Sequence, residues 1–156
     1  MSLLILESSP EPSWSLQLVE LQGQCFHPPW TKQQIDQQLA GKRGFNFAWQ
    51  IDDQLVGYVF YQLLFEQAEI IQIAIQPKFQ KQGLAAQLIS QSCDYLQQRE
   101  IEKVLLEVRE SNRAAIALYT KLGFVVDGIR SNYYPANGQS KTREHAKLYS
   151  LVLAPL

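Results

Sequence analysis

One stretch near the middle of the chain constrains its fold more than any other. An apolar run, Ile70–Ile75, is typical of a strand and is followed by a turn at Gly83 that opens a long helical pattern. A second apolar run, Val104–Val108, predicts another strand, and a short helix is expected between Asn112 and Gly123. Strand, helix, strand and helix in this order predict a βαβα unit.

The helix after the turn has a face for burial but no side chain that could cap its start. The stripe expected to be buried recurs at helical spacing and consists of Leu84, Ala85, Leu88, Ile89, Ser92, Cys93 and Leu96. No Ser, Thr, Asp or Asn stands at positions 80–83, so the first amides of the helix lack a side-chain acceptor. An anion could bind there, attracted by the helix dipole and by Lys81, and Gly83 would let it approach the backbone. The alternative is an ordinary surface turn whose amides bind water.

At these residues the chain resembles a known family. The turn Gln80-Lys81-Gln82-Gly83-Leu84-Ala85 resembles the Gln/Arg-x-x-Gly-x-Gly/Ala motif with which the GNAT N-acetyltransferases hold the pyrophosphate of acetyl-CoA. The second half of the family pattern is matched by Leu106–Arg109, Ser111–Asn112, Ala114–Tyr119 and Leu122–Phe124. The segment Arg130–Pro135 is narrower and resembles the ribosomal-protein-alanine (RimI-type) N-acetyltransferases, which modify protein N-termini.

The resemblance implies the fold and the cosubstrate. It implies one domain over residues 1–156 with the α+β GNAT fold, a mixed, mostly antiparallel twisted sheet with helices on both faces. It also implies that acetyl-CoA binds with its pantetheine arm along the strand edge at residues 73–75. The implied cofactor-binding residues are Ile73, Ala74, Ile75, Gln80, Lys81, Gln82, Gly83, Leu84, Ala85, Ala86 and Asn112. From the residues alone, Asn112 could instead cap the helix that follows it, or could do both.

Glu107 is the candidate general base, the role of the matching residue in the family. Its alternative is a surface carboxylate paired with Lys103 or Arg109. An α-amine has a pKa of about 8, so about 10% of it is neutral at pH 7, against well under 0.1% of a lysine amine. A modest base, acting directly or through a water molecule, could therefore complete the deprotonation of an α-amine.

Tyr119 is the candidate general acid, again by its match to the family. Its alternative is a core tyrosine on the short helix, next to a stripe of Ala115, Leu118 and Leu122. A thiol and a tyrosine have pKa values of about 8.5 and 10, so proton transfer to a leaving CoA thiolate is only about 2 kcal/mol uphill. A positioned phenol could protonate the sulfur or hydrogen-bond it.

The C-terminal part is expected to bind the acceptor substrate. Tyr133 and Tyr134 are expected in a loop before Pro135, where the resemblance has them contact the first residues of a protein N-terminus; alternatively they cover the sheet edge. A turn is expected at Asn137-Gly138, between strands at 124–130 and 148–153. His145 is expected to be a surface residue without a partner.

The remaining elements follow from periodicity and caps. The sequence predicts a first strand at 3–6, a weakly amphipathic helix of two to three turns near residues 16–23, and a second helix, 32–39, capped by Thr31. Alternating residues over 45–75 predict an antiparallel meander that leads into the glycine turn.

Composition narrows the class of protein. With a net charge of −1, two cysteines, two histidines and no signal-like N-terminus, the 156-residue chain is expected to be a cytoplasmic protein that binds no metal, nucleic acid or membrane. Cys93 lies on the buried stripe and is not a candidate nucleophile. The resemblance implies the activity, which is direct transfer of acetyl from acetyl-CoA, in a ternary complex, to the N-terminal α-amine of a protein, here the N-terminal alanine of a small-subunit ribosomal protein. The alternatives are a small-molecule amine or lysine as acceptor, or a non-catalytic acyl-CoA-binding module.

Overall fold

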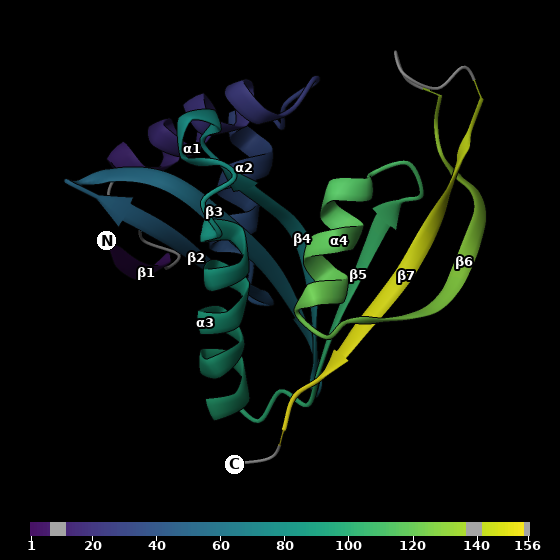
Figure 1. Cartoon of the computed structure of the whole chain (residues 1–156). Coiled ribbons are helices and arrows are strands. Elements are labelled where there is room, and N and C mark those ends of the chain that lie inside the picture. The colour runs from purple at the N-terminus through teal and green to yellow at the C-terminus, as the bar shows by residue number, and fades with distance from the viewer. Residues whose placement is uncertain (7–11, 137–141, 155–156) are drawn as a thin grey trace.

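A seven-stranded sheet with helices on both faces forms the computed structural model, which describes residues 1–6, 12–136 and 142–154 (Figure 1). The strands are β1 (Ser2–Leu6), β2 (Gly44–Ile51), β3 (Gln54–Leu64), β4 (Gln67–Ile75), β5 (Lys103–Arg109), β6 (Val125–Tyr134) and β7 (Glu144–Val152). The α-helices are α1 (Pro12–Cys25), α2 (Lys32–Ala40), α3 (Leu84–Gln98) and α4 (Arg113–Lys121). The strand order is β1-β2-β3-β4-β5-β7-β6, and of the pairs that join the strands only β4–β5 is parallel. The predicted meander and βαβα unit are therefore confirmed.

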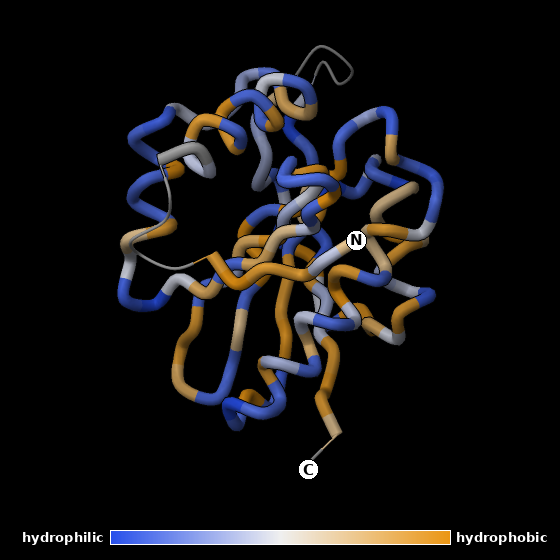
Figure 2. Tube along the Cα trace, turned by 90° about the vertical axis from the view of Figure 1, so that its left-hand side faces the viewer, coloured by the Kyte–Doolittle hydropathy of each residue, from blue (hydrophilic) through white to orange (hydrophobic). Residues whose placement is uncertain are grey.

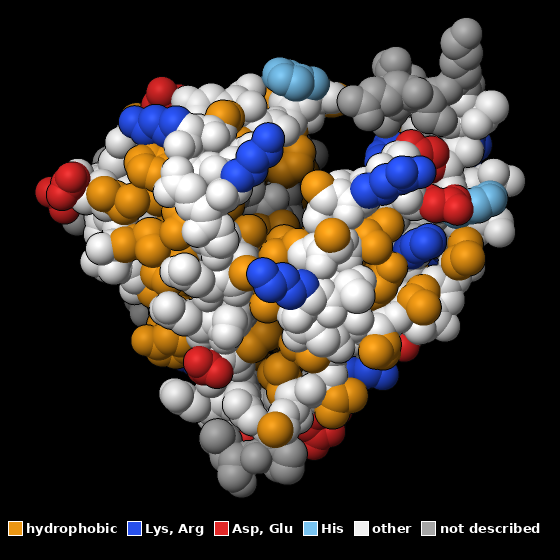
Figure 3. All heavy atoms as spheres, viewed as in Figure 1, with side chains coloured by type: hydrophobic (Ala, Val, Ile, Leu, Met, Phe, Trp, Pro, Cys, Tyr) orange, Lys and Arg blue, Asp and Glu red, His pale blue; other side chains and the backbone are white. Residues whose placement is uncertain are grey.

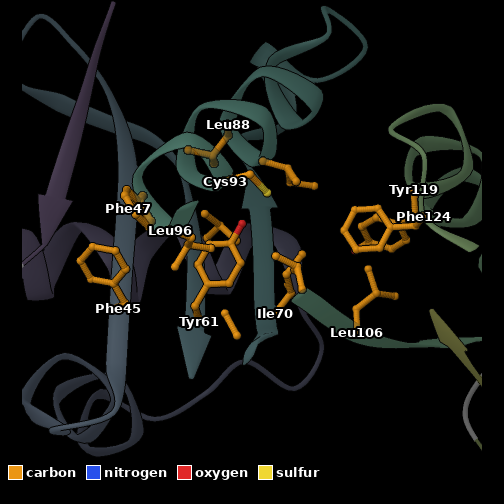
Figure 4. Packing of buried hydrophobic residues seen from close by; sticks show 14 of the residues in the cluster. Phe45, Phe47, Tyr61, Ile70, Leu88, Cys93, Leu96, Leu106, Tyr119 and Phe124 are labelled. Atoms are coloured by element: carbon orange, nitrogen blue, oxygen red, sulfur yellow. The ribbon is translucent and has the colours of Figure 1, made fainter. Parts of the chain in front are cut away.

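Two hydrophobic clusters lie on opposite faces of the sheet. The first contains the buried faces of α3 and α4, and Figure 4 shows its two halves, one under α3 and one where Tyr119 and Phe124 meet Leu106. The second contains the buried residues of α1 and α2. Side chains alternate between the clusters along the strands, with Phe47 in the first and Ala48 in the second. Figure 2 shows hydrophobic strands running through the middle of the molecule and mostly hydrophilic turns at its periphery.

The sheet opens between β4 and β5. These two strands pair only from Gln67 to Glu69 and from Lys103 to Leu105, and beyond that point they diverge (Figure 1). The β3–β4 register shifts next to this point, because Phe60 pairs with Gln72 whereas Tyr61 pairs with Ile70. Ile71 is thus the extra residue of a β-bulge, and a bulge bends its strand. The bend takes the end of β4 away from β5.

Helix starts follow the caps in the sequence. Thr31 accepts the backbone N–H of Gln34, and the Gln34 side chain accepts the backbone N–H of Thr31, which completes a capping box for α2. Asn112 caps α4 by accepting the N–H of Ala115 at 3.2 Å. By contrast, Gly83 at the start of α3 provides no side-chain cap. The expected uncapped start of α3 is confirmed.

Several boundaries differ from the expectation. Helix α1 is longer than the two to three turns expected, and β7 begins at Glu144 rather than at 148. The predicted loop with Tyr133 and Tyr134 is wrong, because both residues belong to β6. His145 has a partner after all, since its Nδ1 accepts the backbone N–H of Asn132 at 3.0 Å. The turn at Asn137-Gly138 lies outside the described residues.

The described residues lack two features, a membrane-spanning helix and a cluster of metal ligands. In this part of the chain no helix combines the length and the apolar character needed to cross a membrane. The same ranges hold no group of three or more His, Cys, Asp or Glu side chains placed to bind a metal ion.

Candidate active site

A groove of about 450 Å³ lies where β4 and β5 part. Its walls bring together residues from α1, β4, β5, α4 and β6, which are far apart in the sequence. They are Cys25, Phe26, Ile71, Gln72, Ile73, Ala74, Ile75, Gln80, Ala85, Glu107, Val108, Arg109, Asn112, Ala115, Leu118, Tyr119 and Tyr134. The surface is visibly hollowed between the part over α3 and the part over α4 (Figure 3).

Glu107 enters the groove from β5. The residues of β5 alternate in burial, and Val104, Leu106 and Val108 belong to the cluster under α3 and α4, so Glu107 points toward the α1–α2 face. Its side chain is 21% exposed, and its Oε1 lies 3.2 Å from a guanidinium nitrogen of Arg130 on β6. Neither Lys103 nor Arg109 is its partner, which corrects the alternative drawn from the sequence. The carboxylate is thus partly desolvated, beside one cation, at the edge of a groove.

Arg109, the expected partner, has other contacts. One of its guanidinium nitrogens lies 3.5 Å from a Glu144 oxygen, and the group stacks 4.5 Å from the ring centre of Tyr134. The same nitrogen also donates to the carbonyl of Pro135. Arg109 therefore joins the end of β5 to the end of β6 beside the groove.

Tyr119 reaches the groove from α4 on the other face of the sheet. The residue is only 6% exposed and packs on Phe124, with ring centres 5.6 Å apart (Figure 4). In the described part of the chain its hydroxyl has no hydrogen-bond partner, and it is not among the fully buried polar atoms there that lack one, so it remains accessible to solvent. The phenol is therefore a donor open to the groove that Tyr119 lines.

Burial, and to a smaller extent the neighbouring Tyr134, raises the pKa of Tyr119 to about 12. The hydroxyl therefore keeps its proton throughout the physiological range. The pKa of Tyr119 then exceeds that of a thiol by about 3.5, so proton transfer to a thiolate is about 5 kcal/mol uphill. Unperturbed pKa values gave a smaller barrier to this transfer. Hydrogen bonding to a thiolate thus requires less free energy than full proton transfer to it.

The turn before α3 offers backbone donors. Gly83 has φ +79°, and a Cβ added there would meet no atom within 4 Å. Because no side chain caps α3, the amides of its first turn remain available to an anion. Gln80 ties this turn to β4 by donating from Nε2 to the carbonyl of Ile75 at 2.9 Å.

The edge of β4 is also available. Gln76 donates its backbone N–H to the carbonyl of Val56 on β3. Because successive residues of a strand direct their backbone groups to opposite sides, the N–H and C=O groups of Ile75 and Ile73 point away from β3 and toward the groove. Among the described strands none pairs with this edge beyond Glu69, and only side chains, those of Gln80 and Cys25, are seen there to donate to the carbonyl of Ile75. An extended ligand could therefore pair with it as a strand would.

Not all predicted cofactor residues line the groove. Those that do are Ile73, Ala74, Ile75, Gln80, Ala85 and Asn112, whereas Lys81, Gln82, Gly83, Leu84 and Ala86 form the turn and the start of α3 beside it. Leu84 faces the core, and its carbonyl accepts the indole N–H of Trp49. Asn112 uses its Oδ1 as the α4 cap, and its amide nitrogen has no partner within residues 1–6, 12–136 and 142–154, so a ligand could bind it.

The two tyrosines of β6 differ in position. Tyr134 lines the groove, while Tyr133 packs edge-on against it at 5.1 Å and lies under the guanidinium of Arg130 at 4.9 Å. Burial and the charge of Glu107 raise the pKa of Tyr134 to about 12, so its hydroxyl is a hydrogen-bond donor. The pair is thus fixed by packing and by two arginines.

Several groove residues were missed from the sequence. Cys25 and Phe26 come from the end of α1, and the only signal was that a Pro-Pro-Trp break follows them. Gln72 and Ile71 reach the groove through the bulge in β4, which no local pattern announces.

Comparison with known proteins identifies the family. A model of the acetyltransferase (GNAT) family matches residues 15–124. The ribosomal protein bS18-alanine N-acetyltransferase of Escherichia coli (strain K12) is 35% identical over 136 residues, 87% of this chain and 88% of that protein. Its counterpart in Salmonella typhimurium is 41% identical over 95 residues, 61% of this chain and 64% of that protein.

A solved structure extends the likeness to the whole fold. The crystal structure of the ribosomal-protein-S18-alanine N-acetyltransferase from Escherichia coli superposes with a TM-score of 0.85 at 31% identity, covering 99% of this chain and 96% of that one. The expected GNAT fold is thereby confirmed. Because the family model matches more than half of the chain, the protein belongs to the GNAT acetyltransferase family.

Proposed function

We propose that this protein transfers the acetyl group of acetyl-CoA to the N-terminal α-amine of a protein, by direct attack in a ternary complex. The observation that carries the proposal is the approach of Glu107 and Tyr119 to one groove from opposite faces of the sheet. A base on one side and a proton donor on the other suit an amine that attacks a thioester held between them. A module that only binds acyl-CoA would need neither group.

The acetyl-CoA site rests on two features of the backbone. The uncapped amides at Gly83 would bind the pyrophosphate, with Lys81 adding charge, and the β4 edge at Ile73 and Ile75, which none of the described strands covers, would bind the pantetheine arm. Asn112 and Gln80 also line the groove. This arrangement would place the acetyl carbon between Glu107 and Tyr119.

In the proposed reaction the neutral amine attacks the thioester carbonyl carbon and its proton passes to Glu107, directly or through a water molecule. The tetrahedral intermediate then collapses, the carbon–sulfur bond breaks, and Tyr119 hydrogen-bonds or protonates the departing thiolate. Tyr134, a donor on the Glu107 face, would contact the first residues of the acceptor, and Tyr133 would hold Tyr134 in place.

The names of the relatives indicate the acceptor. The Escherichia coli and Salmonella typhimurium proteins are both named for acetylation of the alanine of ribosomal protein bS18. We propose the N-terminal alanine of a small-subunit ribosomal protein as the acceptor here too. The two free cysteines, Cys25 and Cys93, suit the reducing cytoplasm in which such a protein is made.

Binding of acetyl-CoA at the turn can be tested by Gly83→Glu. A saturating ligand should raise the melting temperature of the wild type by about 5 °C or more, and the carboxylate should abolish this shift by occupying the anion site. Gly83→Ala is the matched control, because it has the same positive φ and its methyl group meets no neighbour. The Gly83→Ala variant should keep most of the shift in melting temperature. An undiminished shift in Gly83→Glu would show that the pyrophosphate does not bind at this turn.

The choice of an α-amine can be tested with two peptides of equal sequence, both with alanine first and a lysine inside. One has a free N-terminus and the other is blocked. Only the free peptide should be acetylated rapidly, because its amine is partly neutral at pH 7 and lysine is not. If both peptides were acetylated at equal rates, and on the lysine, the acceptor would be a lysine side chain and not the α-amine.

A further inference from the structure

A buried polar network connects the start of α2 to the groove. Gln22 on α1 is fully buried, and its Oε1 accepts the backbone N–H of Trp30 at 3.1 Å. Its Nε2 donates to the hydroxyl of Tyr58 at 2.8 Å and also to Oε1 of Gln72. Tyr58, fully buried as well, donates its proton to the same Gln72 oxygen at 2.7 Å. Gln72 is the member of the network that lines the groove.

The network leaves one orientation for the Gln72 amide. A backbone N–H can only donate, so the atom of Gln22 that faces Trp30 must be its oxygen. The Gln22 nitrogen then faces Tyr58 and Gln72 as a donor, and the Gln72 atom that meets it must be an oxygen. Burial raises the pKa of Tyr58, which keeps its hydroxyl protonated as the second donor. The nitrogen of Gln72 is therefore turned away from the network and has no partner among the described residues.

Gln72 and Glu107 lie on the same face and at the same level of the sheet. Gln72 contacts Gln22 and Tyr58 on the α1–α2 face, the face toward which Glu107 points. Glu69 pairs with Leu105 in the parallel register. Two residues further along each strand, Ile71 and Glu107 therefore stand at the same height in the sheet, and Gln72 follows Ile71 directly. β4 and β5 diverge here, which places the two side chains on opposite walls of the groove.

We infer that the amide nitrogen of Gln72 donates a hydrogen bond to the carbonyl oxygen of the first residue of the acceptor peptide. This inference rests on the proposed function. In any peptide the first carbonyl oxygen is three bonds from the α-amine, so an amine at Glu107 brings that oxygen close to the facing wall. Arg109, a second side-chain donor on this face, is already engaged by Glu144 and Pro135. Tyr134, a third donor, lines the groove from β6 and not from the β4 wall that faces Glu107. Gln72 thereby orients the amine toward the thioester and selects acceptors that have a carbonyl next to it.

The test compares a peptide beginning with alanine and its analogue with a thioamide at the first peptide bond. The sulfur accepts hydrogen bonds more weakly than oxygen, and any change that it makes in the basicity of the amine affects every enzyme variant alike. The ratio of kcat/KM for the oxygen peptide to that for the sulfur peptide should fall by about threefold to tenfold in Gln72→Met, the effect of one neutral hydrogen bond.

Two further variants separate binding from packing. Gln72→Glu keeps an oxygen for Gln22 and Tyr58 but presents no amide to the groove, so it should lose the preference even if Gln72→Met folds poorly. Tyr58→Phe removes a bond of the network without touching that amide, and it should keep the wild-type ratio. An unchanged ratio in both Gln72 variants would overturn the assignment while the proposed function stands. If the wild type acetylates no peptide α-amine, the proposed function fails and the assignment fails with it.

Discussion

Replacing Glu107 by Gln should lower kcat by about 10²- to 10⁴-fold, the usual contribution of one acid–base group. The substitution keeps the shape of the side chain but removes the proton acceptor that enters the groove from β5. Affinity for acetyl-CoA should change little, because the proposed CoA contacts come from β4, the turn at Gly83 and α4. Raising the pH through about 8 should restore part of the rate, since the amine then loses its proton unaided.

Glu69→Gln is the matched control for this experiment. Glu69 is an exposed residue on the neighbouring strand, in the part of β4 that still pairs with β5, and it does not line the groove. Partial burial of its carboxyl group, and next the charge of Glu107, raise its pKa, so this variant removes a carboxylate from the same neighbourhood. Its loss should change kcat by less than about threefold, within the small effect of an exposed charge. If Glu107→Gln were as active as Glu69→Gln, Glu107 would be only the structural partner of Arg130.

Tyr119→Phe should slow the chemical step by about 10²-fold, the lower end of the range for a proton donor. Its hydroxyl has no hydrogen-bond partner among the described residues, so its removal should leave the melting temperature nearly unchanged. A thioester with a more acidic thiol needs less help in leaving, and it should lose less from the mutation. Because the pKa of Tyr119 is about 12, kcat should show no loss from its ionisation between pH 7 and about pH 10.

Tyr61→Phe is the control for Tyr119→Phe, because it should lower the stability of the protein without slowing the reaction. The Tyr61 hydroxyl is buried and forms a 2.7 Å hydrogen bond with Ser92 on α3, away from the groove. Its removal should cost about 1 kcal/mol of unfolding free energy and leave kcat intact. Equal losses for both thioesters in Tyr119→Phe, or a fall in stability without a fall in rate, would make Tyr119 a packing residue.

Elements with local signals could be predicted from the sequence. The βαβα unit was visible because Val104 and its neighbours form an apolar run between two helical patterns, and Thr31 and Asn112 marked helix starts by their capping chemistry. The end of β6 was not visible, because nearly every residue of that strand is exposed and no alternation develops. β7 starts early for a similar reason, since Glu144 and His145 are polar residues of a strand near the sheet edge.

The groove itself depends on contacts between distant segments. Its opening results from the short β4–β5 register and the bulge at Ile71, and neither leaves a periodic trace in the sequence. The ion pair of Glu107 with Arg130 reaches from β5 across β7 to β6, and the sequence could not give this order of strands. Gln72 looks like a polar interruption of an apolar strand until the buried partners from α1 and β3 are known.

The central claim is tested most directly on the N-termini of ribosomal proteins in cells of the source organism. Mass spectrometry would compare cells that contain this protein, cells that lack it, and cells in which Glu107→Gln replaces it. One small-subunit protein with an N-terminal alanine should carry an acetyl group in the first cells and a free amine in the other two. Full acetylation of these N-termini in cells that lack the protein would contradict the account.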